Sequence, residues 1–155
     1  MFIWASPPCT EYSRAKTVGI RELDEADKIV KRTWEITQYF RPPLGYVIEN
    51  TQTEFLKDRE VMQGIEYTDV DYCKYGMPYR KRTRLWNNID DLWTPRPLCQ
   101  WDCGYIRAGT KRHNEVAQHS PNRCDIEWQR RHSRNELYRV PTHLVKEILM
   151  SFKPE

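Results

Sequence analysis

The sequence of 155 residues predicts an α/β fold in a single domain. Two observations carry this prediction. Short apolar segments alternate with one long amphipathic helix over residues 1–89, a pattern typical of an α/β sheet. Residues 90–139 contain prolines, cysteines and no hydrophobic period, and residues 140–152 return to a helical pattern. We therefore expect a sheet-forming core, a loop-rich insert and a closing helix.

The first elements are a buried strand and a helix. Residues 1–6 are almost all apolar, and Pro7 and Pro8 cannot continue a strand ladder. Residues 22–40 place apolar side chains on one stripe at helical spacing, and "RPPLG" ends the segment. The residues of this stripe are Leu23, Ala26, Val30, Trp34, Thr37 and Phe40.

Three further strands are expected before residue 90. Residues 46–49 form the second strand, and residues 54–63 are compatible with a short helix. Residues 67–73 alternate in polarity, and residues 83–89 follow the "YGMP" turn. This order predicts a mostly parallel sheet that ends in a hairpin.

The last element is a helix at residues 140–152, with Pro141 in its first turn. Its expected apolar face consists of Val140, Leu144, Val145, Ile148, Leu149 and Phe152. The resulting division is a core at 1–89, an insert at 90–139 that serves target recognition or binds zinc, and the closing helix.

Charge and cysteine content restrict the setting. The net charge of +3 is mild, but basic residues cluster at 79–84 and 129–134, where they could neutralise phosphates or simply form solvated faces. The five cysteines are odd in number, and no apolar signal segment or membrane-length run is present. We expect an intracellular protein, in the cytoplasm or, in a eukaryotic host, the nucleus.

Polar groups follow the predicted strands where an α/β sheet binds its ligands. Cys9 follows the first strand, and Glu49 and Asn50 follow the second. A thiolate and a carboxylate in one cleft can perform covalent chemistry with proton transfer. Alone, a cysteine of this kind is often a packing residue, and a Glu-Asn pair is often a turn. The order and spacing of the pieces favour a catalytic site.

Three motifs together resemble those of the DNA cytosine-C5 methyltransferases. "SPPCTEYSRA" resembles the Pro-Cys motif, "VIENT" the Glu-Asn motif, and "YGMPYRKRTRLW" the later Gly-x-Pro-Gln-x-Arg-x-Arg motif. The run "DYCKYGMPYRKRT" is similar to a divergent phage and viral branch of the family. The resemblance covers residues 1–89 and implies the second half of a Rossmann-like methyltransferase sheet.

The resemblance also implies a mechanism. A target cytosine would flip out of the DNA, Cys9 would attack C6, and Glu49 would bond N3 and the exocyclic amine. The methyl group would come from S-adenosylmethionine. By the same resemblance Pro8 shapes the nucleophile loop, Asn50 fixes that loop or the strand end, and both lie at the cofactor.

The basic motif aligns in two ways. Counted from Pro78, Lys81 and Thr83 fall on the family's arginines; counted back from "LW", Arg82 and Arg84 do. The second alignment keeps both guanidinium groups, and we prefer it. Arg82 and Arg84 would then hold the base, the loop or the phosphates. The residues expected to contact DNA are Ser13, Arg80 and Lys81.

The glycine-rich cofactor loop of the family has no counterpart before Cys9, because the first glycine is Gly19. Its absence would leave the first strand with an unpaired edge, which favours association. We expect this edge to be covered by a second chain with the cofactor half, by a second copy of this chain, or by an N-terminal segment that this sequence lacks.

The insert contains candidate zinc ligands. Zinc prefers a tetrahedral set of nitrogen and sulfur atoms, and a loop-rich segment with little core gains from one. The first choice of ligands is Cys99, Cys103, His113 and Cys124, with His119 and His132 as further candidates. The spacing is not that of two tight C-x2-C pairs, and unremarkable free thiols are the alternative.

Three functions remain open at this point. The first is the catalytic portion of a cytosine-C5 methyltransferase that needs a cofactor-binding partner. The second is an inactive methyltransferase remnant that binds nucleic acid or serves as a subunit of a larger assembly. The third is a zinc-bearing DNA-binding module, which would leave the Pro-Cys strand unexplained.

Overall fold

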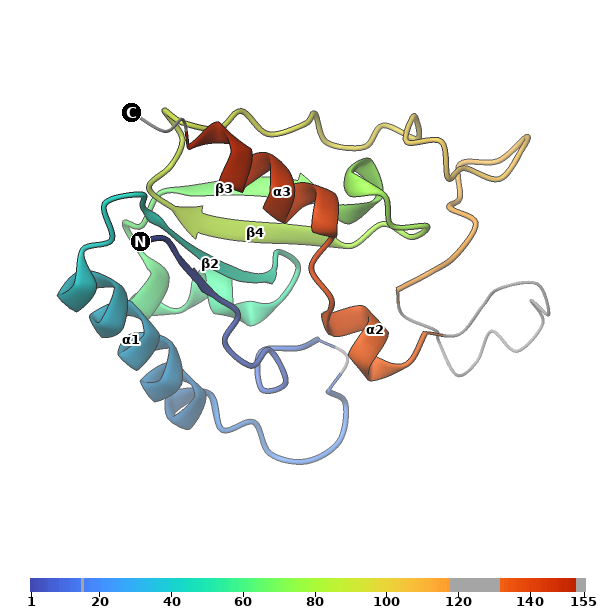
Figure 1. The fold of residues 1–155 in the computed structure, drawn as a ribbon. Helices are drawn as coiled ribbons and strands as arrows, with labels where there is room; N and C mark the ends of the chain where they lie inside the picture. The colour runs from blue at the N-terminus through green and yellow to red at the C-terminus, as the bar shows by residue number, and fades with distance from the viewer. Residues whose placement is uncertain (15, 118–131, 153–155) are drawn as a thin grey trace. The chain divides into compact units, whose positions relative to one another are not determined.

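The computed structural model describes residues 1–14, 16–117 and 132–152 and divides into two compact units (Figure 1). Unit 1 comprises Met1–Asp69 and Arg82–Pro95, and unit 2 comprises Val70–Lys81 and Arg96–Glu155. The chain thus passes from unit 1 to unit 2 and back before it enters unit 2 again. The division into a core at 1–89, an insert and a closing helix remains a prediction.

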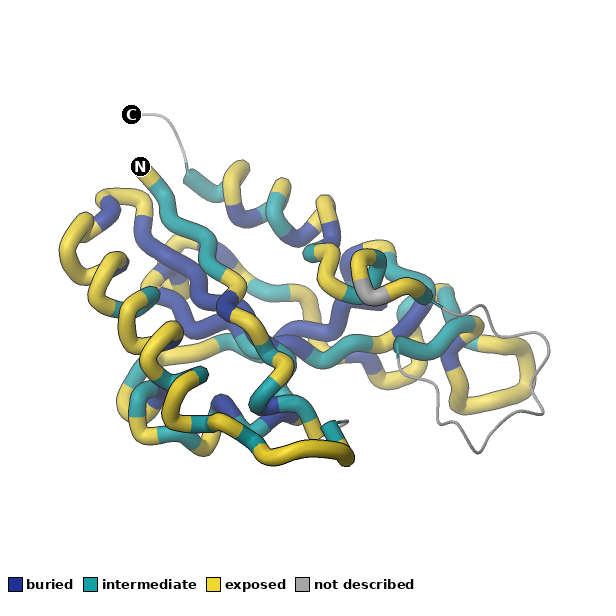
Figure 2. The backbone as a smooth tube through the Cα atoms, turned by 90° about the horizontal axis from the view of Figure 1, so that it is seen from below, coloured by how far each residue is buried: buried dark blue, intermediate teal, exposed yellow. Residues whose placement is uncertain are grey.

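A four-stranded sheet in the order β1-β2-β4-β3 contains the strands expected from the sequence. The strands are β1 (Ile3–Ala5), β2 (Tyr46–Thr51), β3 (Tyr67–Asp71) and β4 (Arg82–Asn87). β1 pairs with β2 in parallel, and β2 pairs with β4 antiparallel. Almost all of β2 is buried (Figure 2): it is an inner strand, and its Tyr46 and Ile48 pack in a buried cluster with Val30 of the helix that precedes it in the chain.

The sheet is mixed, so the expectation of a mostly parallel sheet is wrong. The amide of Asn87 donates to the carbonyl of Glu66, and the amide of Tyr72 donates to that of Lys81. β3 and β4 therefore run in opposite directions, as the predicted hairpin requires. The connection between them is too short for the crossover that parallel strands need.

Helix α1 (Leu23–Phe40) packs against the sheet of unit 1 through the predicted stripe. Val30 and Thr37 are buried, and the ring of Trp34 meets that of Tyr46 edge to face at 5.4 Å. The buried cluster consists of Tyr12, Val30, Tyr46, Ile48, Leu56, Met62 and Trp86. Phe40 was wrongly placed on this stripe: it is 52% exposed, because the helix ends there and Arg41 turns the chain at φ 40°.

The remaining elements are short. The predicted helix at 54–63 is instead two 3-10 turns, η1 (Phe55–Asp58) and η2 (Glu60–Met62), because Arg59 between them is extended. Unit 2 contains η3 (Tyr72–Tyr75), α2 (Arg134–Tyr138) and α3 (Thr142–Ser151).

Helix α3 matches the expected closing helix and contacts η3 within unit 2. Leu144 and Ile148 are buried as predicted, whereas Leu149 is exposed. Leu149 lies about 100° around the helix from Ile148, so it does not share the buried side of the helix. Of the helices described, none has the length and apolar character needed to cross a membrane.

Gly45, at the start of β2, offers a stability test of unit 1. Its φ is +84°, and an added Cβ would lie 2.5 Å from Ile89 Cγ2 and 2.7 Å from Asn88 Oδ1. Gly45→Ala should therefore reduce the free energy of unfolding by about 2–4 kcal/mol, from backbone strain and overpacking together. Urea unfolding measures this loss.

The matched control is Gly64→Ala, because Gly64 has a similar φ of +75° and no atom within 4 Å of the added Cβ. Only the backbone strain remains there, at about 1–2 kcal/mol. Equal losses for the two variants would contradict the predicted clash at Gly45.

Candidate active site and a cysteine-histidine cluster

The Pro-Cys loop and the Glu-Asn motif meet at one end of the sheet in unit 1. The parallel pairing aligns Ala5 with Ile48, so the residues that follow β1 lie beside the end of β2. The Nδ2 of Asn50 donates a buried hydrogen bond of 3.1 Å to the carbonyl of Pro7. Asn50 therefore ties the loop that carries Cys9 to the strand that carries Glu49.

Tyr12 anchors the far side of the nucleophile loop. Its amide donates to the carbonyl of Cys9 at 3.1 Å, and its ring is fully buried. Its hydroxyl donates to Asp27 in α1 at 2.8 Å, and burial raises the pKa of this hydroxyl. The thiol of Cys9 is half-buried in this loop. A half-buried thiol held between fixed neighbours remains open to a substrate while its position is set by the fold.

Glu54 fixes the end of the loop. Its carboxylate accepts the backbone amide of Arg14 and, at 3.4 Å, the hydroxyl of Ser13. The side chain is only 4% exposed, and burial raises its pKa above the ordinary value of 4.5. Ser13, which we expected to contact DNA, thus has a structural contact inside the protein. Its role toward DNA remains a prediction.

The pKa of Glu54 predicts a pH dependence of stability. The raised pKa means that the folded chain binds this proton more tightly than the unfolded chain, so stability falls as pH rises from the unfolded pKa through the folded one. Glu54→Gln cannot titrate. Its free energy of unfolding relative to wild type should therefore improve as pH rises from about 4 to about 8.

Chemical denaturation of the two proteins across this pH range measures the effect. Glu60→Gln makes the same side-chain change at an exposed position of the next 3-10 turn and is the control for the substitution itself. A difference between wild type and Glu54→Gln that does not change with pH would contradict the prediction.

The carboxylate of Glu49 is also buried, with 6% of the residue exposed. In the register of β2 with β4, Glu49 lies opposite Leu85 and Asn50 lies opposite Arg84. The Glu-Asn motif therefore shares this part of the sheet with the basic motif. Its proposed contacts to a cytosine remain a prediction.

Four basic residues were expected to hold the base or contact DNA. Arg82 and Arg84 lie in unit 1, and Arg80 and Lys81 lie in unit 2. Arg84 in unit 1 makes two hydrogen bonds to Asp69, at 2.8 and 3.0 Å, and stacks on the ring of Tyr67 at 3.5 Å. The hydrogen bond to Asp69 raises the pKa of the guanidinium. This bidentate contact gives Arg84 a structural role between β3 and β4, whatever it does toward a base or phosphate.

The other three basic residues have contacts of their own. Arg82 in unit 1 accepts the amide of Gln52 on its backbone carbonyl at 3.1 Å. In unit 2, Lys81 donates to the carbonyl of Leu137 at 3.0 Å, and Arg80 lies over the ring of Trp101 at 5.9 Å. Binding of DNA by these residues remains a prediction.

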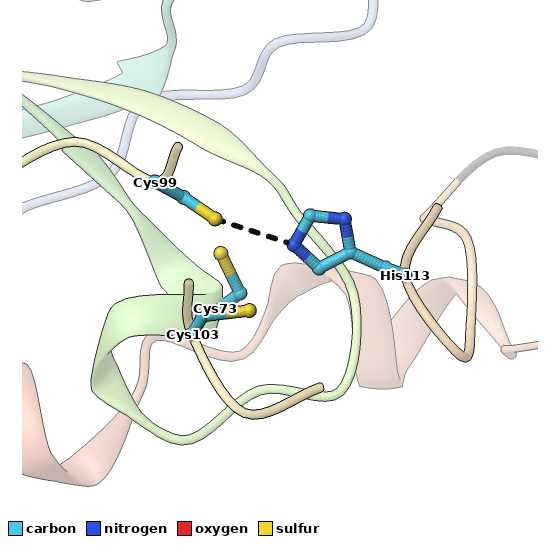
Figure 3. Close-up of side chains that lie close together, drawn as sticks. All are labelled: Cys73, Cys99, Cys103 and His113. Carbon is cyan, nitrogen blue, oxygen red and sulfur yellow. Dashed lines mark hydrogen bonds between the residues drawn. The ribbon is translucent and has the colours of Figure 1, made fainter. Parts of the chain in front are cut away.

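A second constellation lies entirely in unit 2 (Figure 3). Its ligand-type atoms all lie within 4.8 Å of one another, and the Sγ of Cys99 is 3.6 Å from the Nε2 of His113. All but one of its residues are buried; Cys103 is half-buried. The cluster consists of Cys73, Cys99, Cys103 and His113.

The cluster contains three of the four zinc ligands expected from the sequence. The fourth, Cys124, lies outside the described residues, as does His119. Cys73 was missed because it was assigned to a strand at 67–73. In the structure β3 ends at Asp71, and Cys73 lies in η3. The sequence did contain a hint. Cys73 lies two residues before the "YGMP" turn, so a strand that ended earlier would have placed it in a loop.

Burial dominates the electrostatics of the cluster. It raises the pKa of Cys73 and of Cys103, and the neighbouring thiols add to the effect on Cys73. Burial also lowers the pKa of His113. All these shifts favour uncharged side chains when no cation is present. Such a set of soft ligands is suited to zinc, which binds thiolates and neutral imidazole.

No family model matches the chain. It is nevertheless similar to a DNA cytosine-C5 methyltransferase, the class that the sequence motifs indicated, and this confirms the predicted resemblance. The relative is a protein of Frog virus 3 (isolate Goorha) named "Probable DNA (cytosine-5)-methyltransferase". The two are 35% identical over 101 residues, which cover 57% of this chain and 46% of the viral protein. The chain thus spans about half the length of the curated relative it matches.

Proposed function

We propose that this chain is the catalytic portion of a DNA cytosine-C5 methyltransferase. The observation that carries the proposal is the hydrogen bond from Asn50 to the carbonyl of Pro7, because it joins the two motifs that would supply nucleophile and carboxylate. The similarity to the viral protein supports the same class of reaction. In this proposal the sheet is the second half of a Rossmann-like sheet.

The proposed chemistry begins with a cytosine turned out of the duplex. The thiolate of Cys9 adds to C6 and forms an S–C6 bond, while the electron pair of the C5–C6 double bond moves to C5. Glu49 assists by holding a proton at N3 and accepting the exocyclic amine. After C5 has taken up the methyl group, a base removes the C5 proton. The electron pair of that C–H bond restores the C5–C6 double bond, and the thiolate of Cys9 leaves with the electron pair of the S–C6 bond.

S-adenosylmethionine, when bound, supplies the electrophilic methyl group. A hollow of about 380 Å³ beside Pro8 is lined by Glu11, Glu22, Glu25 and Lys28. Because Glu11 is paired with Lys16 and Glu25 with Lys28, this hollow alone does not supply the negative charge that would suit a sulfonium ion. Pro8 and Asn50 are the residues proposed to lie at the cofactor. The remaining contacts are proposed to come from a second chain that carries the cofactor half.

We propose that the partner binds along the edge of β1. Among the described residues, β1 pairs with β2 and with no other strand, so the opposite row of backbone groups is available for pairing. A second chain with the cofactor half, or a second copy of this chain, would complete the sheet there.

Transfer of labelled methyl groups from S-adenosylmethionine to cytosine-containing duplex DNA tests the proposed function. The full chain is assayed alone and together with the polypeptide encoded directly upstream. Label in the DNA, with the chain alone or only in the mixture, supports the proposal. A folded chain that binds DNA or the second polypeptide and transfers no label under either condition would overturn it in favour of an inactive remnant.

A further inference from the structure

We propose that unit 2 holds a structural zinc ion, bound by the side chains of Cys73, Cys99, Cys103 and His113. The proposal does not depend on the methyltransferase function, because all four residues belong to unit 2 and the proposed catalytic residues Cys9 and Glu49 to unit 1.

The spacing of the ligand atoms fits a tetrahedral ion. With zinc–sulfur bonds near 2.3 Å and zinc–nitrogen bonds near 2.0 Å, two ligand atoms of a tetrahedron are about 3.5–3.8 Å apart. The Sγ of Cys99 and the Nε2 of His113 are separated by 3.6 Å. All four ligand atoms lie within 4.8 Å of one another, so small side-chain rotations bring the set onto one ion.

The chain between Cys99 and Gly104 follows a tight path. Trp101 has φ 64° and Gly104 has φ 80°, so the chain turns sharply within and after the Cys-x3-Cys segment. A non-glycine residue in the left-handed region is held there by its surroundings. The amide of Tyr105 donates a hydrogen bond to the sulfur of Cys103, which helps to fix its position beside the other ligands.

A short hairpin presents His113. The amide of Arg107 donates to the carbonyl of Arg112 at 2.9 Å, and the amide of Asn114 donates to that of Tyr105 at 2.8 Å. His113 pairs with Ile106 in an isolated bridge between the two strands of this hairpin. The imidazole therefore extends from a backbone that is fixed on both sides.

Further contacts bring Cys73 to the other ligands. Asp71, which is buried, accepts the amide of Cys99 at 2.9 Å. Next to the ligands, Lys74 forms an ion pair of 2.8 Å with Asp102. These contacts join the connection after β3 to the segment around Cys99, although the two are far apart in the sequence.

Charged side chains of both signs surround the four ligands. Three thiolates and one neutral imidazole around Zn²⁺ give a net charge of −1. Lys74 lies close enough to interact with Cys99 and Cys103, and Arg80 with His113. These cations offset part of the negative charge of the complex, and Asp102, which pairs with Lys74, and Asp71, which interacts with His113, oppose them.

The site is of the structural kind. Four protein ligands leave no open position for water or substrate, as in structural zinc sites. Over residues 96–117 the structure describes no helix and only an isolated bridge, so this segment has little regular hydrogen bonding of its own. Binding energy from a metal would supply part of the free energy that folds it.

Zinc content and cobalt substitution of the full chain test this proposal. Protein purified without chelators and reconstituted with zinc should contain one zinc ion per chain by atomic emission. Reconstitution with Co²⁺ should give the thiolate-to-cobalt charge-transfer bands and the visible bands of a tetrahedral site. Chelation should lower the midpoint of thermal unfolding, and added zinc should restore it.

The chain offers matched variants for this test. Cys73→Ser, Cys103→Ser and His113→Ala should each reduce zinc content and change the cobalt spectrum, whereas Cys9→Ser and Cys124→Ser should leave both unchanged. Each ligand variant is titrated with Co²⁺ as well, so that weakened binding is seen even where zinc is lost on purification.

Three results would overturn the proposal. One is zinc well below stoichiometric in the reconstituted wild type. Another is retention of the full cobalt spectrum in Cys73→Ser with its loss in Cys124→Ser, which would restore the ligand set expected from the sequence. The third is a disulfide between cluster cysteines in the native protein. None of these results bears on methyl transfer.

Discussion

Replacement of Cys9 by alanine is expected to abolish methyl transfer to DNA. The proposed mechanism depends on the S–C6 bond, and no other described thiol lies in unit 1. Removal of a covalent nucleophile costs about 10⁴-fold or more in rate. Initial rates with labelled S-adenosylmethionine and duplex DNA, under whichever condition the wild type is active, measure the loss.

Duplex DNA that contains 5-fluorocytosine provides a second measurement. After methylation its C5 carries fluorine and a methyl group but no proton, so the thiolate cannot be expelled and the protein stays bonded to the DNA. Wild type should give a denaturation-resistant complex, and Cys9→Ala should give none. The variant should keep the thermal midpoint of wild type, which shows that it folds. Methylation by Cys9→Ala at a rate near that of wild type would refute the nucleophile assignment.

Glu49→Gln is expected to reduce methyl transfer by about 10²–10⁴-fold, the usual contribution of a group that transfers a proton. Glutamine has nearly the same size and can still hydrogen-bond, so the buried position on β2 remains filled. It cannot hold a proton at N3, so addition of the thiol to C6 becomes unfavourable. Steady-state rates and the rate of 5-fluorocytosine trapping should fall together.

The matched control is Glu66→Gln, which makes the same change in charge at an exposed position just before β3. It should leave both rates within a few-fold of wild type. If Glu49→Gln reduced methyl transfer no more than Glu66→Gln, the carboxylate would have no part in the chemistry, and Glu49 would be a structural residue of β2.

The elements of unit 1 followed from local patterns. The apolar run before Pro7, the helical stripe of α1 and the strand that contains Glu49 were all predicted, because side-chain periodicity reflects which face of an element is buried. The parallel pairing of β1 with β2 then placed Asn50 within reach of Pro7. The meeting of the Pro-Cys and Glu-Asn motifs was thus predictable from their positions after neighbouring strands.

Other features depended on the direction of strands and on where elements end, and periodicity defines neither. The direction of β4 relative to β2 made the sheet mixed. The early end of β3 at Asp71 moved Cys73 from a strand into a 3-10 turn. Arg84 was predicted as a ligand of base or phosphate, and its bidentate contact with Asp69 became visible only when β3 and β4 were paired.

The sequence by itself determined the four strands, the helices α1 and α3, the motif residues Cys9, Glu49 and Asn50, and three of the four residues in the cysteine-histidine cluster. Only the tertiary structure decided that Cys73 is the fourth. The hydrophobic period that identifies a strand or a helix involves residues close together in the chain, so it can be recognised in the sequence. A tetrahedral site joins residues from separate segments, and which cysteine arrives there depends on the path of the backbone between them.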